Sequence, residues 1–288
     1  MPSENISKDY DDIPIRRSYV RDVLQRLEFT RGVSVEEIGH VRYGPHRYPL
    51  VLARYPRRWN AKNPTVLLSA GMHGGESAGM HALLDFLRNG VRPYGRRCNF
   101  AVFPCVNPSG FEADTRETMA GVDCNRAFGT CSRSEEVRAV EQWLDFSVPR
   151  LIPPQLLLAM DLHEDGPDAP CDASAGAESP LGCYLYETMC DRRRRIGRVL
   201  IDALPSEAEA CTWSHIYGDI NDRGVIAYPE GCRNPVYRQA ASIDAFLVQE
   251  RYADHVIVTE TPTVWSMEKR IAVQRLWLRK ALDFVLAG

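Results

Sequence analysis

Histidine and glutamate lie three residues apart in the segment GMHGGES, as His73 and Glu76. This spacing lets an imidazole and a carboxylate meet at one cation, and His163 in the distant segment MDLHED would complete a set of three ligands. Catalytic zinc commonly has three protein ligands of these types and keeps one position open for water. The H-x-x-E pair is weak on its own, because a Glu that starts a helix beside a surface His gives the same pattern.

The candidate reactive residues share one position, since each follows an apolar run that predicts a core strand. Continuous apolar runs of this length are typical of strands that are buried on both faces. In open α/β sheets, ligands bind at the carboxyl ends of the strands. The sequence therefore predicts a site at this edge of a sheet. The runs are 64–70, 98–106, 155–162 and 255–259, and the residues after them include His73, Asn107, His163 and Glu260.

Helical periodicity separates these predicted strands. The alternation predicts a single α/β domain over 1–288, with a mostly parallel or mixed sheet that is covered by helices on both faces. Residues 205–240 show no clear pattern, and 167–180 predict a loop. Helices are predicted over 16–29, 76–87, 134–146, 188–204 and 265–286, and further strands over 33–41, 48–54 and 182–187, the first two as a hairpin.

Composition excludes several classes of protein. The 288 residues are 44% hydrophobic and 25% charged, as in ordinary globular proteins, and the net charge of −3 does not favour nucleic acid or an anionic membrane as a partner. Nine cysteines without a C-x-x-C pair indicate neither a disulfide scaffold nor a cysteine zinc site. The basic run 192–195 is expected on a solvated helix face, with anion binding as the alternative.

No segment predicts export or membrane insertion. The start of the chain, MPSENISKDYDD, lacks the basic residues and the apolar run of a signal peptide. No apolar stretch approaches the roughly 20 residues that a membrane span needs. We therefore expect a cytoplasmic protein.

Five short motifs resemble the ordered motif set of the zinc carboxypeptidases, the family of pancreatic carboxypeptidase A. They are GMHGGES, NPSGF, GVDCNRAF, MDLHED and VTETPT, within a match from about residue 35 to residue 270. The resemblance implies a mixed sheet of about eight strands with helices on both sides, and one bound zinc ion. Because no secretion signal or pro-segment is visible, the chain looks more like the intracellular or bacterial members.

The resemblance also implies a role for each motif residue. The zinc ligands would be His73, Glu76 and His163; Asp123 would support His73; Glu260 would be the catalytic base; Arg116 would polarise the scissile carbonyl; and Asn125 and Arg126 would hold the substrate carboxylate. Without the motifs, these arginines could be surface ion-pair residues and Glu260 a solvated carboxylate. A tyrosine that covers the substrate would fall on Tyr237, with Tyr217 and Tyr228 as rivals.

Two acidic residues, Glu164 and Asp165, follow the third ligand, unlike in most pancreatic-type members. A second, co-catalytic metal would need such extra carboxylates. We prefer the interpretation that one of them orients a ligand or caps a turn.

Three functions are compatible with these residues. The first is a zinc metallocarboxypeptidase acting on peptides. The second is a zinc-dependent N-acyl amino acid amidohydrolase that resembles aspartoacylase and succinylglutamate desuccinylase. Both would take a substrate with a free carboxylate, either a peptide or an acylated amino acid. The third is a binding module on an inactive scaffold, although every position needed for catalysis holds a competent residue.

Overall fold

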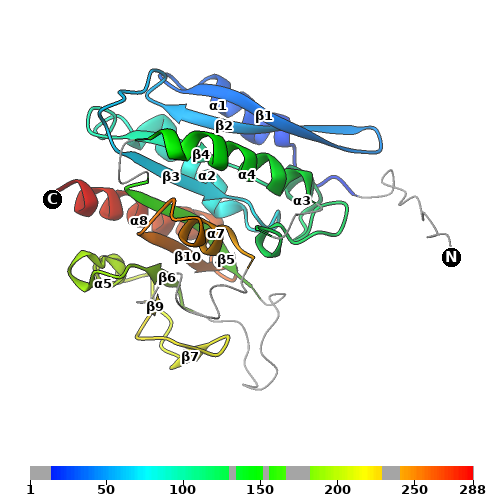
Figure 1. Cartoon of the computed structure of the whole chain (residues 1–288). Helices are drawn as coiled ribbons and strands as arrows, with labels where there is room; N and C mark the ends of the chain where they lie inside the picture. The colour runs from blue at the N-terminus through cyan, green and yellow to red at the C-terminus, as the bar shows by residue number, and fades with distance from the viewer. Residues whose placement is uncertain (1–13, 130–133, 152–155, 167–181, 229–240, 288) are drawn as a thin grey trace.

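Eight strands form one mixed sheet in the order β1-β2-β4-β3-β5-β10-β6-β9 (Figure 1). The computed structural model describes residues 14–129, 134–151, 156–166, 182–228 and 241–287. Four of the seven strand pairs are parallel, including β4–β3, β3–β5 and β5–β10 at the centre. The strands are β1 (Ser34–Tyr43), β2 (His46–Tyr55), β3 (Thr65–Ala70), β4 (Asn99–Phe103), β5 (Leu158–Asp165), β6 (Tyr184–Thr188), β9 (Val225–Tyr228) and β10 (Val256–Pro262).

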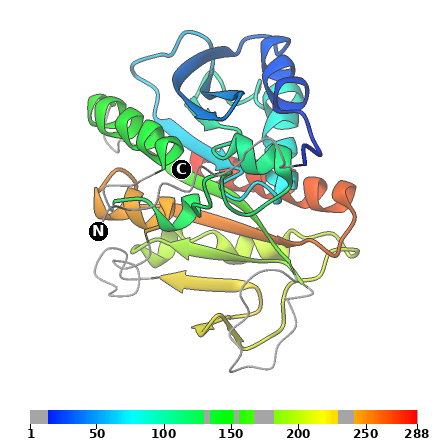
Figure 2. The ribbon, with the colours of Figure 1, turned by 90° about the vertical axis from the view of Figure 1, so that its right-hand side faces the viewer.

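Helices cover both faces of the sheet (Figures 1 and 2). Neighbouring residues of β3 belong to different core clusters, Leu68 on one face and Leu67 on the other, because strand side chains alternate. On the Leu68 face lie η1 (Val20–Leu24), α1 (Gln25–Glu28), α2 (Ser77–Asp85), α5 (Gly197–Asp202) and α8 (Met267–Ala287); on the Leu67 face lie α4 (Glu135–Ser147) and α7 (Ile243–Gln249).

The central strands are buried along their whole length. Every residue of β3 and every residue of β5 is buried, as expected for parallel strands that helices cover on both faces. The predicted fold class, a mixed and mostly parallel sheet of about eight strands with helices on both sides, is therefore confirmed. The extension of one domain over the whole of 1–288 stays a prediction.

The helix predicted over 188–204 is wrong in its first half. Only a 3₁₀ turn, η6 (Arg192–Arg194), precedes α5, so the basic run does not lie on an α-helix. The side chain of Asp191 accepts a hydrogen bond from the N–H of Arg193, and the buried Glu187 carboxylate accepts from the N–H groups of Ile196 and Gly197. These side-chain acceptors start the helix late.

Three short elements lie outside the predicted ones. The segment 205–240 contains β9 and a small hairpin of β7 (His215–Ile216) and β8 (Asp219–Ile220). The strand predicted over 98–106 is limited to β4, and the loop after it contains α3 (Pro108–Ala113). Further short helical turns are η2 (Phe86–Gly90), η3 (Cys124–Arg126) and η4 (Val148–Arg150). No helix among the described residues is long and apolar enough to cross a membrane.

Candidate metal centre and active site

The three predicted metal ligands meet at the carboxyl edge of the parallel strands. His73 and Glu76 lie in the turn between β3 and α2, and His163 lies near the end of the adjacent β5. One potential ligand atom from each side chain lies within 4.8 Å of the other two. The edge that the sequence indicated is therefore where the side chains converge.

The turn that carries His73 and Glu76 packs directly on α3. A Cβ atom on Gly74 would lie 1.9 Å from the backbone carbonyl carbon of Gly110, so only glycine fits there without displacing a chain. Asn107 fixes the other side of this contact, because its side chain accepts a hydrogen bond from the N–H of Gly110 and caps α3. The segments GMHGGES and NPSG thus position one another.

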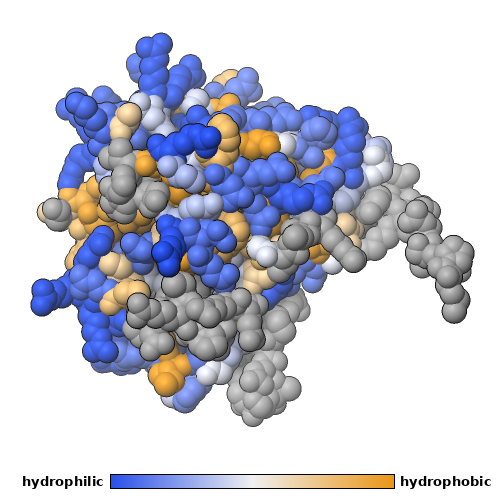
Figure 3. Space-filling view, viewed as in Figure 1, coloured by the Kyte–Doolittle hydropathy of each residue, from blue (hydrophilic) through white to orange (hydrophobic). Residues whose placement is uncertain are grey.

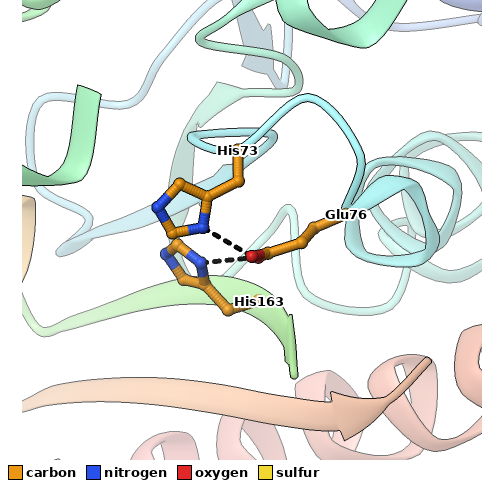
Figure 4. Close-up of side chains that lie close together, drawn as sticks. All are labelled: His73, Glu76 and His163. Atoms are coloured by element: carbon orange, nitrogen blue, oxygen red, sulfur yellow. Dashed lines mark hydrogen bonds and ion pairs between the residues drawn. The ribbon is translucent and has the colours of Figure 1, made fainter. Parts of the chain in front are cut away.

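Both imidazoles direct Nδ1 at the Glu76 carboxylate (Figure 4). Nδ1 of His73 lies 2.5 Å from Oε1, and Nδ1 of His163 lies 2.8 Å from Oε2. Burial would raise the pKa of Glu76, but the neighbouring imidazoles outweigh it and hold that pKa well below its usual range. Two imidazole nitrogens and an ionised carboxylate are the donor set that catalytic zinc takes.

A carboxylate holds the far nitrogen of each imidazole. Nε2 of His73 lies 3.2 Å from Oδ1 of Asp123, and Nε2 of His163 lies 2.7 Å from Oδ2 of the buried Asp161. The hydroxyl of Ser69 donates to the other oxygen of Asp161 at 2.7 Å. Such carboxylates fix the ring tautomer and leave Nδ1 free to bind a metal.

Asp123 was predicted for this role, and Asp161 was missed. Asp161 lies two residues before His163 on β5, so both side chains lie on the same face of the strand. An acidic residue inside the otherwise apolar run QLLLAMDL is the signal that could have identified it. Burial would lower the pKa of His163, but Asp161 and Glu76 outweigh it and raise that pKa well above its usual range.

Glu260 lies beside the three ligands. On β10 it is the register partner of His163, and its side chain lines the same cavity. Burial raises the pKa of Glu260 well above its usual range; the His163 charge opposes this shift, while Glu76 and Asp165 add to it. A carboxylate in this position can exchange a proton with a water molecule at the metal.

Arg116 points at the ligands and Arg126 does not. The Nε and Nη2 atoms of Arg116 lie 3.0 and 2.9 Å from Oδ2 of Asp123, and its Nη1 lies 3.4 Å from Nδ1 of His73. Nη1 of Arg126 donates to the carbonyl of Asn125 at 2.8 Å, and within the described part of the chain Arg126 forms no ion pair. Its guanidinium is therefore available for a ligand carboxylate.

Comparison with known proteins supports the fold that the sequence resemblance implied. The catalytic-domain model of the succinylglutamate desuccinylase/aspartoacylase family matches residues 62–171. A solved structure of a proposed metallopeptidase from Shewanella amazonensis superposes with a TM-score of 0.71 and 24% identity, over 93% of this chain and 92% of that one. The chain has a zinc carboxypeptidase-like fold. This fold is the one that the resemblance seen in the sequence implied.

More distant structures with this zinc carboxypeptidase-like fold cover nearly as much of the chain. A metallo-carboxypeptidase from Burkholderia cenocepacia is 17% identical with a TM-score of 0.64, over 93% of this chain and 68% of that one. The ectoine utilization protein EutE (DoeB) from Ruegeria pomeroyi is 16% identical with a TM-score of 0.55, over 89% and 68%. No curated protein matches the chain in sequence. Together, the family model and these structures support a metal-dependent hydrolase of this superfamily.

The side chains of Glu164 and Asp165, which follow the third candidate ligand, bind protein groups outside the three-ligand cluster. Glu164 is buried, with Oε1 accepting from Nη1 of Arg270 at 2.5 Å and Oε2 accepting from the N–H of Ala78 at 2.7 Å. Burial raises the pKa of Glu164 to about 7, although Arg270 opposes the shift. The Asp165 carboxylate accepts hydrogen bonds from two tyrosine hydroxyls. Neither side chain belongs to a second metal-binding cluster among the described residues.

The three candidate metal ligands line a cavity of about 350 Å³. Tyr217 and Tyr228, the two rival tyrosines, both line it, whereas Tyr237 lies outside the described residues. Among the coloured residues on the face seen in Figure 3, hydrophilic residues predominate. Besides the three ligands and Glu260, the lining residues are Arg116, Asn125, Arg126, Glu164, Asp165, Tyr184, Tyr186, Tyr217, Asp219, Tyr228, Ser242, Asp244 and Val258.

Proposed function

We propose that this protein is a zinc metallocarboxypeptidase that hydrolyses the C-terminal peptide bond of its substrate. One arrangement carries the proposal: a His, Glu, His ligand set shares a cavity with the buried Glu260 and with an Arg126 that forms no ion pair within the described part of the chain. The first two features serve hydrolysis, and the third serves recognition of a terminal carboxylate.

Each residue then has a defined task. When bound, zinc supplies Lewis acidity that polarises water and a carbonyl oxygen. Glu260 takes the proton of the attacking water and later delivers it to the leaving amine. Arg116 places a positive charge beside His73, where the carbonyl oxygen gains negative charge during attack. Arg126, with the side-chain N–H of Asn125, holds the free carboxylate and so fixes which bond lies near Glu260.

A second candidate is a zinc-dependent N-acyl amino acid amidohydrolase. The match of residues 62–171 to the succinylglutamate desuccinylase/aspartoacylase catalytic domain favours it. The bond broken is again an amide next to a free carboxylate, so the same residues would act in the same order. The two candidates differ only in whether the group on the other side of the amide is a peptide or a simple acyl chain.

The deciding experiment compares three substrate sets with the zinc-loaded protein. Peptides with a free C-terminus, the same peptides with an amidated C-terminus, and N-acetyl or N-succinyl amino acids are incubated with it, and released amino acid is measured. A carboxypeptidase cleaves only the first set at a high rate. Cleavage of only the third set would replace the first candidate by the second. No cleavage of any set, with zinc retained, would indicate a binding module instead.

Several expectations from the sequence accompany this proposal. We propose a substrate with a free carboxylate, one zinc ion rather than two, and no nucleic-acid or membrane partner. The cytoplasmic location also stays a prediction.

A further inference from the structure

The cavity continues beyond the metal ligands along β6 and β9. This part is lined by Asp165, Tyr184, Tyr186, Tyr217, Asp219 and Tyr228, which we call the acidic wall. The sheet order places β6 and β9 on one side of β5 and β10, and β3 and β4 on the other. Arg116 and Arg126 come from the loops after β4, so the cavity is basic on one side and acidic on the other.

Tyrosine hydroxyls hold both carboxylates of the acidic wall in place. Tyr184 and Tyr217 donate to the two oxygens of Asp165, each at 2.8 Å, and Tyr228 donates to Oδ2 of Asp219 at 2.7 Å. A phenol that donates a hydrogen bond orients a carboxylate without neutralising its charge. The acidic wall therefore presents negative charge that is fixed in direction.

The carboxylate of Asp219 can still accept a hydrogen bond or an ion pair from a ligand. Its side chain is only partly buried, its Oδ1 accepts no hydrogen bond from the described residues, and it forms no ion pair with them. Among the described lining residues of the acidic wall there is no Lys, Arg or His. A cationic group placed here would be the partner that Asp219 lacks within the described part of the chain.

The tyrosine rings suit the stem of such a group. Tyr186 and Tyr228 stack with their planes 3° apart and their centroids at 6.1 Å, and Tyr184 meets Tyr186 edge to face at 5.7 Å. Ring surfaces of this kind pack against methylene groups, and electron-rich ring faces attract cations. The acidic wall therefore combines an apolar ring surface with the negative charge of Asp219.

We propose that the acidic wall, through Asp219, selects substrates whose C-terminal residue, the one that cleavage releases, carries a cationic side chain, as lysine and arginine do. This inference rests on the proposed function, because it assumes that Arg126 holds the carboxylate of the same residue. The carboxylate then lies at the basic side of the cavity, and the side chain crosses to the acidic side. An acidic side chain would meet like charge there and is rejected.

The test compares substrates that differ in one charge. Benzoylglycyl-lysine and benzoylglycyl-norleucine have the same chain length, but only lysine ends in an ammonium group, and benzoylglycyl-glutamate supplies the opposite charge. For the full-length, zinc-loaded protein we expect kcat/KM for lysine to exceed that for norleucine at least tenfold, with glutamate the slowest. In Asp219→Asn the lysine-to-norleucine ratio should fall at least fivefold. The amide oxygen can still accept from Tyr228, and thermal unfolding checks the fold.

The control is Asp222→Asn, which removes a carboxylate that is 73% exposed and does not line the cavity. It should leave the lysine-to-norleucine ratio as in the wild type. A wild-type ratio near one, or an unchanged ratio in Asp219→Asn, overturns the proposal while the hydrolytic function stands.

Binding separates this inference from the proposed function. If no substrate is hydrolysed, the proposed function fails, and calorimetric titration of the same protein with free lysine and free norleucine decides the inference alone. Tighter binding of lysine that Asp219→Asn abolishes supports the acidic wall as a cation site. Equal binding of both amino acids overturns it.

Discussion

Asp161 offers a sharp test of how the metal centre is held, because the asparagine variant changes charge and leaves shape almost unchanged. Asp161 is buried, its Oδ2 lies 2.7 Å from Nε2 of His163, and its Oδ1 accepts from Ser69. In Asp161→Asn the side-chain oxygen can accept from Nε2–H of His163. The amide N–H can donate to the Ser69 hydroxyl, which can act as donor or acceptor. The hydrogen-bond network therefore survives.

The loss is the negative charge that makes His163 a stronger ligand. Removing a carboxylate that supports a metal-binding histidine typically costs 10- to 100-fold in metal affinity, or about 1.4 to 2.7 kcal/mol. Because the contact is short and buried, we expect Asp161→Asn to lie in the upper half of this range. Ser69→Ala, one bond further from the ligand, should cost less than tenfold.

The assay is a competition for zinc between the protein and a chromophoric chelator, so it does not depend on catalytic activity. Circular dichroism and thermal unfolding of the metal-free proteins check that both variants fold. Zinc affinity within twofold of the wild type in a correctly folded Asp161→Asn would refute the argument. The charge of Asp161 would then have no influence on the metal.

Three other predictions concern the base, the carboxylate site and the core. Glu260→Gln should keep zinc and lose about 10²- to 10⁴-fold in kcat, and retained turnover would exclude Glu260 as the base. Arg126→Ala should impair free peptides far more than amidated ones, and an equal effect on both would argue against a carboxylate clamp. Glu187→Gln should lower the free energy of unfolding by about 3 kcal/mol at pH 7, because the buried carboxylate serves His255 and the N–H groups of Ile196 and Gly197. Measured by urea unfolding, the difference in unfolding free energy between the wild type and Glu187→Gln should be smaller near pH 3.

The sign of that pH dependence follows from the pKa of Glu187. Burial raises it, but His255 and the two backbone N–H groups outweigh burial and leave it below its usual value. A carboxyl group whose pKa is lower in the folded state stabilises the fold above its unfolded pKa. That contribution is lost as the pH falls through the folded pKa. A variant without the carboxylate thus differs least from the wild type in acid, and a loss that grew at pH 3 would contradict this reasoning.

The central strands and the convergence of the candidate ligands could be predicted because one physical signal marks the strands and the edge of the sheet, and the motif resemblance then singled out the ligands. A strand buried on both faces needs a continuous apolar run, and a polar residue directly after it lies at the edge of the sheet. His73 lies in the turn after β3, whereas His163 and Glu260 directly follow their apolar runs but lie inside β5 and β10, near the carboxyl ends of these strands. Their convergence did not require any knowledge of the loops.

The acidic wall could not be predicted in this way. Asp219 lies in a two-residue strand and Tyr228 ends a four-residue edge strand, so neither segment is long enough to show a period. Tyr217 lies in the left-handed region at φ 50° in the turn between β7 and β8, and only tertiary contacts with Asp165 give its hydroxyl a role. The proposed substrate preference rests on such irregular segments, which is why the sequence indicated the candidate chemistry but not the selectivity.

The charges around the candidate ligands favour a cation between them. Glu76, Asp123 and Asp161 lie within hydrogen-bond distance of the two histidines. Arg116 is the one described Lys or Arg side chain that forms an ion pair with any of these carboxylates. A histidine that binds a metal is neutral, and with both imidazoles neutral, three carboxylates beside one guanidinium leave an excess of negative charge in a largely buried space, where charge without a partner is costly. A divalent ion between the imidazoles would offset that excess, so the electrostatics and the donor atoms both fit the same candidate metal site.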